Sequence, residues 1–335
     1  MKTFVYTITF ISIFAKGLAN EKNASTFAEN IKNILDFPDL MDTVTCPDPK
    51  STDYELLLYT RNSTKSILLN KSNLDVLDPN KKTIFITHGW LYASHQMEMV
   101  ALKDAYLKRY DYNVIMVNWE NLAWDFYSSA VCKLPKIGHS IADYICSAVS
   151  NRGLNIENVH LVGHSLGGQM SGFIGQSTIE ICKKKVGRIT GLDPAGPLFV
   201  DTPRPNRLDS TDATVVDIIH TNGGVYGYYG NCGHADFYIN CGSVQEKCRL
   251  GDITMNNLSQ LPQELALCAH ARALHIWAEA VLTDNFKATA CSYCPLVCPS
   301  PFNFLRGTVI MGQEGTKDVS GGYYVKTNYK SPYAI

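Results

Sequence analysis

The chain has 335 residues, of which 45% are apolar and 18% are charged. That balance supports a large buried core and excludes wholesale disorder. Basic and acidic residues nearly cancel to a formal net charge of −1, so the sequence lacks the basic excess that nucleic-acid binding requires.

The first residues have the pattern of a secretory signal peptide. Lys2 supplies the positive charge, and residues 3–15 form an apolar stretch that is too short to span a bilayer. Small residues allow cleavage after Gly17 or Ala19, and the alternative is a membrane anchor or a buried strand. We therefore predict a signal peptide at 1–19 and, because the next residues are polar and weakly patterned, an N-terminal arm or propeptide at 20–49.

The cysteine content agrees with an oxidising, extracellular location. The chain has 11 cysteines, which is typical of a secreted protein held by disulfides, and an odd number leaves at least one thiol unpaired within the chain. For the cluster Cys291, Cys294 and Cys298 we favour a disulfide over a zinc site, because no further ligands are suitably spaced. No later segment predicts a transmembrane helix. Four Asn-x-Ser/Thr sequons are glycosylation candidates: Asn23, Asn62, Asn70 and Asn257.

Short β-branched runs alternate with helical stretches after residue 50. The expected strands are 83–87, 113–119, 159–163, 188–192 and 215–220. The expected helices are 95–110, 138–150, 165–180 and 273–282. This alternation predicts one α/β domain over 50–335, with a mainly parallel central sheet and helices on both faces.

The sharpest motif is G-x-S-x-G at residues 163–167, between the strand 159–163 and the following helix. A serine on such a tight turn has a strained backbone, and side chains two positions away on either side would clash. Gly163 and Gly167 remove that crowding and leave the Ser165 hydroxyl exposed above the sheet. Ser165 is therefore the predicted nucleophile.

A serine nucleophile needs a base, and the base needs a carboxylate. In this fold the three residues follow one another along the chain in the order Ser, Asp/Glu, His. Asp193 ends the strand 188–192 and opens the rigid turn 193–197, so it is the favoured acid. Its competitors, in a polar loop or along the next strand, are Asp209, Asp212 and Asp217.

The favoured base is His270, which follows the other two candidates in the chain. It is expected just before the helix 273–282, whereas its rival His275 falls inside that helix. Position alone leaves this choice open.

A tetrahedral intermediate also needs backbone donors for its oxyanion. The N–H of Leu166 stands at the start of the helix after the nucleophile, where the helix dipole helps. The N–H of Trp90 lies in the loop after the strand 83–87 and is the predicted second donor.

The assembled segments resemble the pancreatic-lipase family, and above all its insect branch of secreted lipases and phospholipases A1. They are TIFITHGW, NVIMVNW, NVHLVGHSLGGQMSGFIG, ITGLDPAGP, IIHTNGG, CGHADFYINCG and CAHARA, in this order. The resemblance covers residues 50–335 and implies an α/β-hydrolase fold with Ser165, Asp193 and His270 as the triad and Trp90 and Leu166 at the oxyanion hole. It also implies that the C-terminal β-sandwich of larger members is missing.

In relatives a cysteine pair brackets a lid, and Cys248 and Cys268 match it, which places the lid at 249–267. Pro262 is expected to interrupt any single long helix there. The lid is nearly as long as in triglyceride lipases, whereas the loop 222–233 is short, as in phospholipases. The insect resemblance favours phospholipase A1, releasing the sn-1 fatty acid through an acyl-enzyme; the alternative is a triacylglycerol or galactolipid lipase.

The resemblance implies a glycerolipid substrate at a membrane or lipid-droplet interface and no required cofactor. A structural calcium is implied at Asp209 and Asp212, with backbone carbonyls of Arg204 and Arg207, although Arg204 replaces an acidic residue. The alternative is that the two carboxylates form a turn. A non-catalytic lipid-binding protein of the yolk type is the remaining function, and the intact Ser165 argues against it.

Overall fold

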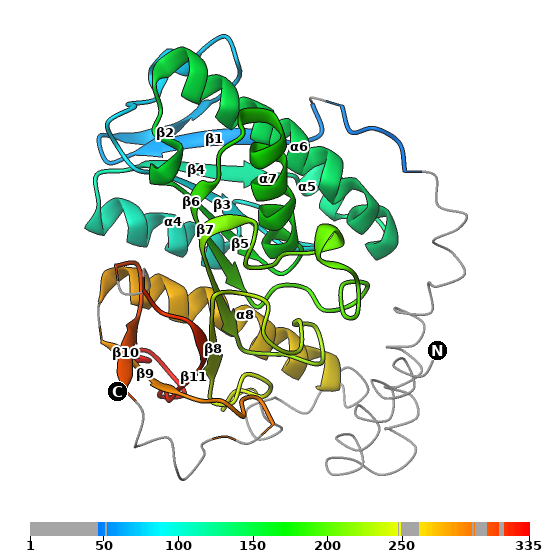
Figure 1. The fold of residues 1–335 in the computed structure, drawn as a ribbon, viewed down its shortest axis with the longest axis vertical. Coiled ribbons are helices and arrows are strands. Elements are labelled where there is room, and N and C mark those ends of the chain that lie inside the picture. The colour runs from blue at the N-terminus through cyan, green and yellow to red at the C-terminus, as the bar shows by residue number, and fades with distance from the viewer. Residues whose placement is uncertain are drawn as a thin grey trace.

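The computed structural model describes residues 46–50, 52–246, 248, 261–283, 285–296, 298, 307–314 and 318–335. In these ranges the strands form one sheet in the order β10-β9-β11-β8-β7-β6-β5-β3-β4-β1-β2 (Figure 1). Neighbours from β11 through β4 pair in parallel, whereas β1, β2, β9 and β10 add antiparallel edges. The α/β-hydrolase fold expected from the sequence is confirmed.

The described strands are β1 (Glu55–Thr60), β2 (Ser63–Leu68), β3 (Thr83–Thr87), β4 (Asn113–Asn118), β5 (Val159–His164), β6 (Val186–Leu192), β7 (Ala213–His220), β8 (Ala235–Ile239), β9 (Phe286–Ala290), β10 (Thr308–Met311) and β11 (Gly321–Val325). The α-helices are α4 (Met97–Arg109), α5 (Glu120–Ala123), α6 (Tyr127–Arg152), α7 (Leu166–Cys182) and α8 (Leu261–Leu282). Short 3-10 turns occur at Leu74–Val76, Ile156–Asn158 and Arg204–Asn206.

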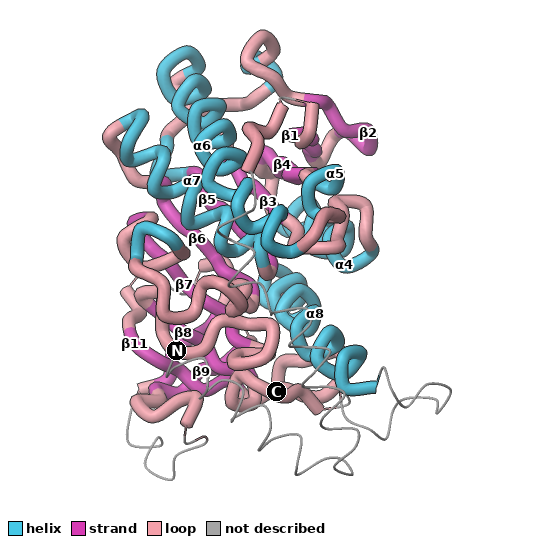
Figure 2. Tube along the Cα trace, turned by 90° about the vertical axis from the view of Figure 1, so that its right-hand side faces the viewer, coloured by secondary structure: helices cyan, strands magenta, loops and turns pink. Residues whose placement is uncertain are grey.

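Helices cover both faces of the sheet, which explains why the central strands β3 and β5 are buried at every position. Phe85 of β3 belongs to the core under α6 and α7, whereas its neighbours Ile84 and Ile86 belong to the core under α4 and α8. Figure 2 shows α8 on the side of the strands away from α6 and α7. Because both faces are buried, the sheet is a rigid platform for the loops at the carboxyl ends of its parallel strands.

Two helix boundaries differ from the sequence prediction. Helix α6 begins at Tyr127 rather than at 138, and Pro135 lies inside it. Helix α8 begins at Leu261 rather than at 273, so His270 lies within the helix and not before it. Pro262 is the second residue of α8, where a missing N–H leaves no intrahelical bond unmade, and the effect of Pro262 on the preceding lid residues lies outside the described ranges.

Four disulfides staple the described residues: Cys46–Cys132, Cys146–Cys182, Cys248–Cys268 and Cys291–Cys294. The bond between Cys146 and Cys182 joins α6 to α7, and Cys291–Cys294 agrees with a disulfide rather than a zinc site. Among the described cysteines, three are not in a disulfide: Cys232, Cys241 and Cys298.

Several predictions from the sequence lie outside the described residues. They are the signal peptide, the arm up to residue 45, the sequons at Asn23 and Asn257, and lid residues 249–260. Within the described ranges, none of the helices combines the length and apolar character that a bilayer crossing requires.

Candidate active site

Ser165 stands at the sharp turn between β5 and α7, with φ 57° and ψ −122°. A non-glycine residue in this region is strained, which is the mark of a nucleophile elbow. The two flanking glycines are required by close approach. A Cβ on Gly163 would lie 2.0 Å from the Gly167 carbonyl oxygen, and one on Gly167 would lie 2.4 Å from the Thr87 carbonyl oxygen. The clash argument made from the motif therefore holds in the structure.

The structure brings Asp193 and His270 together from distant parts of the chain. His270 Nδ1 donates to Asp193 Oδ2 at 2.6 Å, from α8 to the residue that follows β6. Asp193 is fully buried, and its other oxygen accepts backbone N–H groups of Thr221 at 2.8 Å and Asn222 at 3.0 Å. Three donors hold this carboxylate in place, and its bond to Nδ1 fixes the tautomer of the imidazole.

The competing candidates lie in other environments. Asp217 forms a salt bridge with Arg188 at 2.8 Å. His275 stacks on Tyr333. Asp212 Oδ2 accepts the Asp209 N–H, and Asp209 Oδ1 accepts the Thr211 N–H. None of these four is bonded to His270 or Ser165 among the described contacts.

His164, the residue before Ser165 in the chain, contacts His270. Its ring centroid lies 4.6 Å from that of His270, and its Nε2–H donates to the His270 carbonyl at 3.2 Å. Among the described residues, no hydrogen bond joins the Ser165 hydroxyl directly to His270. A loose or absent nucleophile–base bond is common before substrate binds.

The environment keeps His164 neutral beside His270. Burial, with a smaller effect of His270, holds the pKa of His164 well below its usual value. A second imidazolium 4.6 Å away would oppose a positive charge on His270. A neutral His164 therefore anchors the His270 backbone without hindering protonation of that ring.

The loop after β3 lies directly against the nucleophile. A Cβ on Gly89 would be 2.7 Å from Ser165 Cβ and 3.3 Å from Ser165 Oγ. The Trp90 side chain is fixed outside, because its indole N–H donates to the Asp125 carbonyl at 2.8 Å. The Trp90 backbone N–H stays a predicted oxyanion donor.

His88 braces this loop. Its Nδ1–H donates to the Gly89 carbonyl at 2.9 Å, and its Nε2 accepts from the Trp119 N–H at 3.1 Å. Burial lowers the pKa of His88 to about 4, so the ring stays neutral and can both donate and accept.

Leu166 opens α7, so its N–H is among the helix donors without an intrahelical partner. The helix dipole concentrates positive potential there. The turn that carries Asp193 is hydrogen-bonded to the residue before α7, because the Ala195 N–H donates to the Ser165 carbonyl at 3.0 Å.

The cysteines that bracket the expected lid are joined by a disulfide, at a sequence separation of 20. Cys268 lies on α8 two residues before His270, and the Cys248 N–H donates to the Gln245 carbonyl at 3.1 Å. The bond therefore ties one end of the segment 249–267 directly to the helix that carries the candidate base.

Two of the residues implied for calcium, Asp209 and Asp212, lie in one hydrogen-bonded turn. Thr211 N–H bonds Asp209 Oδ1 at 2.6 Å, and Asp209 N–H bonds Asp212 Oδ2 at 2.9 Å. Burial raises the pKa of Asp212 to about 7, the Asp209 N–H that bonds it acts in the opposite direction, and the Asp209 charge adds a smaller increase. Two buried carboxylates in one turn are oxygen ligands of the kind that a hard cation such as calcium binds.

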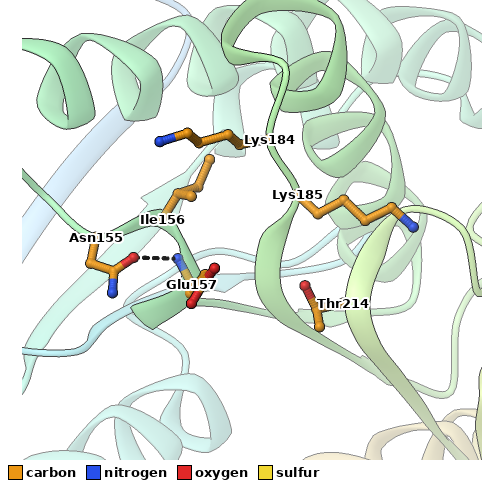
Figure 3. A pocket seen from close by; sticks show the side chains of 6 residues that line it. All are labelled: Asn155, Ile156, Glu157, Lys184, Lys185 and Thr214. Carbon is orange, nitrogen blue, oxygen red and sulfur yellow. Dashed lines mark hydrogen bonds between the residues drawn. The ribbon is translucent and has the colours of Figure 1, made fainter.

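A hollow lined by Asn155, Ile156, Glu157, Lys184, Lys185 and Thr214 lies at the amino ends of β5, β6 and β7 (Figure 3). Ser165 and Asp193 follow the carboxyl ends of β5 and β6. The hollow is therefore at the wrong edge of the sheet for this chemistry.

Sequence reasoning missed the groups that hold the acid and the base in place. The Thr221 and Asn222 amides carry no side-chain signature, and His164 was not among the predicted site residues. A histidine within the G-x-S-x-G motif is the one signal that would have pointed to His164.

The fold places this protein in the α/β-hydrolase class, and its candidate site lies at the carboxyl ends of the parallel strands. The pattern that defines the Lipase family matches residues 31–333, and the chain belongs to that family. It is 34% identical to phospholipase A1 of Polybia paulista over 225 residues, covering 62% of this chain and 70% of that one. It is 28% identical to lipoprotein lipase of Homo sapiens over 360 residues, covering 100% and 72%.

It is also 33% identical to pancreatic lipase-related protein 2 of Bos taurus over 264 residues, covering 73% of this chain and 55% of that one. Among solved structures, the esterase Est1E from Butyrivibrio proteoclasticus with bound ferulic acid aligns with a TM-score of 0.31 and 11% identity, covering 52% and 78%. Membership of the Lipase family makes this protein a carboxylic ester hydrolase that acts on glycerolipids.

Proposed function

We propose that this protein is a secreted phospholipase A1 that uses Ser165, Asp193 and His270 as its catalytic triad. The bond between His270 Nδ1 and Asp193 Oδ2, at 2.6 Å beside the nucleophile elbow, is the observation that carries the triad. It leaves His270 Nε2 as the ring atom that exchanges a proton with Ser165.

Hydrolysis proceeds in two steps. Ser165 Oγ bonds to the sn-1 carbonyl carbon while its proton passes to His270 Nε2, and the Trp90 and Leu166 N–H groups bind the oxyanion. The glycerol oxygen leaves with the proton from His270. Water then bonds through its oxygen to the acyl carbon and gives a proton to His270. The bond between Ser165 Oγ and that carbon breaks, the proton passes from His270 to Oγ, and the fatty acid leaves.

The preference for phospholipid rests on the loop between β7 and β8. This loop folds back on the turn 193–197, which carries Asp193. The Tyr228 N–H donates to the Pro194 carbonyl at 2.7 Å, and the Gly196 N–H donates to the Tyr226 carbonyl at 2.8 Å. A short, tied-down loop matches the expectation for phospholipases, and the similarity to the wasp phospholipase A1 supports it. The separation of 20 residues between the lid cysteines favours the alternative, a triacylglycerol or galactolipid lipase.

Activity on three substrates tests the proposal. Wild type, Ser165→Ala and the control Ser147→Ala, whose hydroxyl bonds the Asp143 carbonyl on α6, are assayed on phosphatidylcholine, triolein and a galactolipid. We expect wild type and Ser147→Ala to release the sn-1 fatty acid of phosphatidylcholine and Ser165→Ala to be inactive. Hydrolysis of triolein or galactolipid alone would overturn the phospholipase assignment, and inactivity on all three would favour a lipid-binding protein.

Secretion and glycosylation are proposals of the same kind. Asn62 and Asn70 are both exposed, in and after the β1–β2 hairpin, so an oligosaccharide meets no packed neighbour there. Expression in eukaryotic cells should yield protein in the medium that begins at residue 18 or 20 and that loses mass on treatment with a glycosidase. Retention of residues 1–19 in the mature protein would contradict the signal peptide.

Calcium is proposed as a structural ion only, held by Asp209 and Asp212 with the Arg204 and Arg207 carbonyls. It would neutralise the two carboxylates and take no part in the ester chemistry. Calcium should raise the melting temperature at pH 8 in wild type but not in Asp209→Asn, and an equal response of the two proteins would remove this proposal.

A further inference from the structure

A second buried His–Asp pair lies beside the candidate triad and has no part in the mechanism above. His220, the last residue of β7, donates its Nε2–H to Asp236 Oδ1 of β8 at 2.9 Å, and both side chains are about 1% exposed. The imidazole stacks on Tyr238, with ring centroids 4.4 Å apart. A pair so completely buried is costly to desolvate unless its bonds are well satisfied.

Asp236 is the hub of this pair. Besides His220, its carboxylate accepts the backbone N–H of Cys232 at 3.0 Å and of Gly233 at 3.2 Å. Three donors converge on one side chain, and only a carboxylate has acceptors on both oxygens for all of them. Asp236 thus fastens the returning end of the β7–β8 loop to the last residue of β7.

The next two residues after His220 are the ones that hold the candidate acid. Thr221 and Asn222 donate their backbone N–H groups to Asp193 Oδ1, at 2.8 and 3.0 Å. The same turn is held from its other side, because the Gln245 amide donates to the Thr221 carbonyl at 2.9 Å. The end of β7 and the turn that follows it therefore fix the positions of the Thr221 and Asn222 amides.

We propose that His220 and Asp236 are positioning residues for Asp193. They fix the end of β7 so that the Thr221 and Asn222 amides hold the carboxylate that orients His270. The inference rests on the proposed function of Ser165, Asp193 and His270. Neither residue touches substrate; each acts through the backbone of the turn.

Substitution of Asp236 by Asn keeps the shape but breaks the pattern of donors. An amide has one acceptor oxygen, and its NH₂ group would face a backbone N–H or the His220 N–H. The end of β7 would shift to relieve this contact. Since a misplacement of about 1 Å at a catalytic group costs on the order of 100-fold in rate, we expect about that loss in kcat with little change in KM.

The control is a buried carboxylate of β7, the strand that ends at His220, and it does not contact Asp193 or the Thr221 and Asn222 amides. Asp217 is fully buried and accepts from Arg188 Nε and Nη2, both at 2.8 Å. Asp217→Asn leaves a buried cation less well paired and should destabilise the protein, yet it should leave kcat and its pH profile unchanged. Comparison of the two variants separates positioning from a general loss of stability.

The pH profile is the readout that a purely structural role would not move. The His270 ring faces Asp193, His164 and Tyr226. Burial holds His164 neutral and raises the pKa of Tyr226 to about 12, so near neutral pH only the Asp193 charge supports an imidazolium. If Asp193 moves away, the acidic limb of kcat/KM shifts to lower pH.

The experiment measures hydrolysis of p-nitrophenyl butyrate and the labelling rate of Ser165 by a fluorophosphonate, together with the melting temperature. We expect Asp236→Asn to lose about 100-fold in both rates and to shift the acidic limb, while Asp217→Asn does neither. His220→Gln keeps a donor but loses the stack on Tyr238, and we expect about a tenfold loss with a smaller shift in the same direction.

Failure of this inference is distinguishable from failure of the proposed function. A wild-type protein that the fluorophosphonate does not label at Ser165 would refute the triad itself. Labelled wild type with unchanged rates in Asp236→Asn and His220→Gln would overturn the positioning role alone. Equal losses in Asp236→Asn and Asp217→Asn with an unmoved pH profile would also overturn it. If Asp236→Asn does not fold, His220→Gln decides by the same criteria.

Discussion

The contact between Gly89 and Ser165 makes Gly89→Ala the most direct perturbation of the oxyanion loop. The added methyl group would lie 2.7 Å from Ser165 Cβ, whereas carbon atoms in contact prefer about 3.5–4.0 Å. One of the two segments must therefore move by about 1 Å. The Trp90 N–H moves with Gly89, so we expect a loss of one oxyanion donor, which costs about 100- to 1,000-fold in kcat.

The assay compares hydrolysis of p-nitrophenyl butyrate by Gly89→Ala, by wild type and by Gly307→Ala. Gly307 is the matched control, because a Cβ there would meet nothing within 4 Å. The control should behave as wild type, and the melting temperature of Gly89→Ala should fall only modestly. A folded Gly89→Ala with the wild-type kcat would refute the placement of the oxyanion hole.

Three further outcomes follow from the same geometry. Asp193→Asn should fold and lose about 10⁴-fold in kcat, since an amide no longer fixes the imidazole tautomer; a loss below about tenfold would contradict its role. Gly163→Ala should cost more than about 4 kcal/mol of stability, because its Cβ would lie 2.0 Å from a backbone oxygen, and a wild-type urea midpoint would contradict this. In EDTA, the free energy of unfolding of wild type should fall as the pH rises from about 4 through about 7. Burial raises the pKa of Asp212 from 3.8 to about 7, so the unfolded chain releases this proton at lower pH than the folded chain does. Asp212→Asn should abolish this loss of stability, which is at most roughly 4 kcal/mol at about 1.4 kcal/mol per pH unit. If the urea midpoints of the two proteins depend on pH in the same way, Asp212 is not the cause.

The sequence predicts the central strands well because burial on both faces makes them continuous apolar runs. Strand β3 has the bounds expected for it, and β4 differs by one residue. The edges were not predicted: β1 and β2 are antiparallel and partly exposed, so their pattern is weak. The first part of α6 was missed because Pro135 breaks the helical pattern, although the helix continues through it.

The candidate site divides in the same way. The candidate catalytic side chains were named from motifs and chain order, whereas the groups that hold them in place could not be predicted. The Thr221 and Asn222 amides act through the backbone, and the pairing of His220 with Asp236 depends on two strands that are adjacent only in the fold. His270 was chosen correctly as the partner of Asp193 but with the wrong local structure, since α8 starts well before it.

A crystal structure of the protein inhibited by a phosphonate tests the central claim most directly. We expect phosphorus bonded to Ser165 Oγ, and a phosphonyl oxygen about 2.7–3.1 Å from the Trp90 and Leu166 nitrogens. His270 Nε2 should face the bridging oxygen while Nδ1 keeps its bond to Asp193. An adduct on any other residue, or a phosphonyl oxygen turned away from both amides, would contradict it.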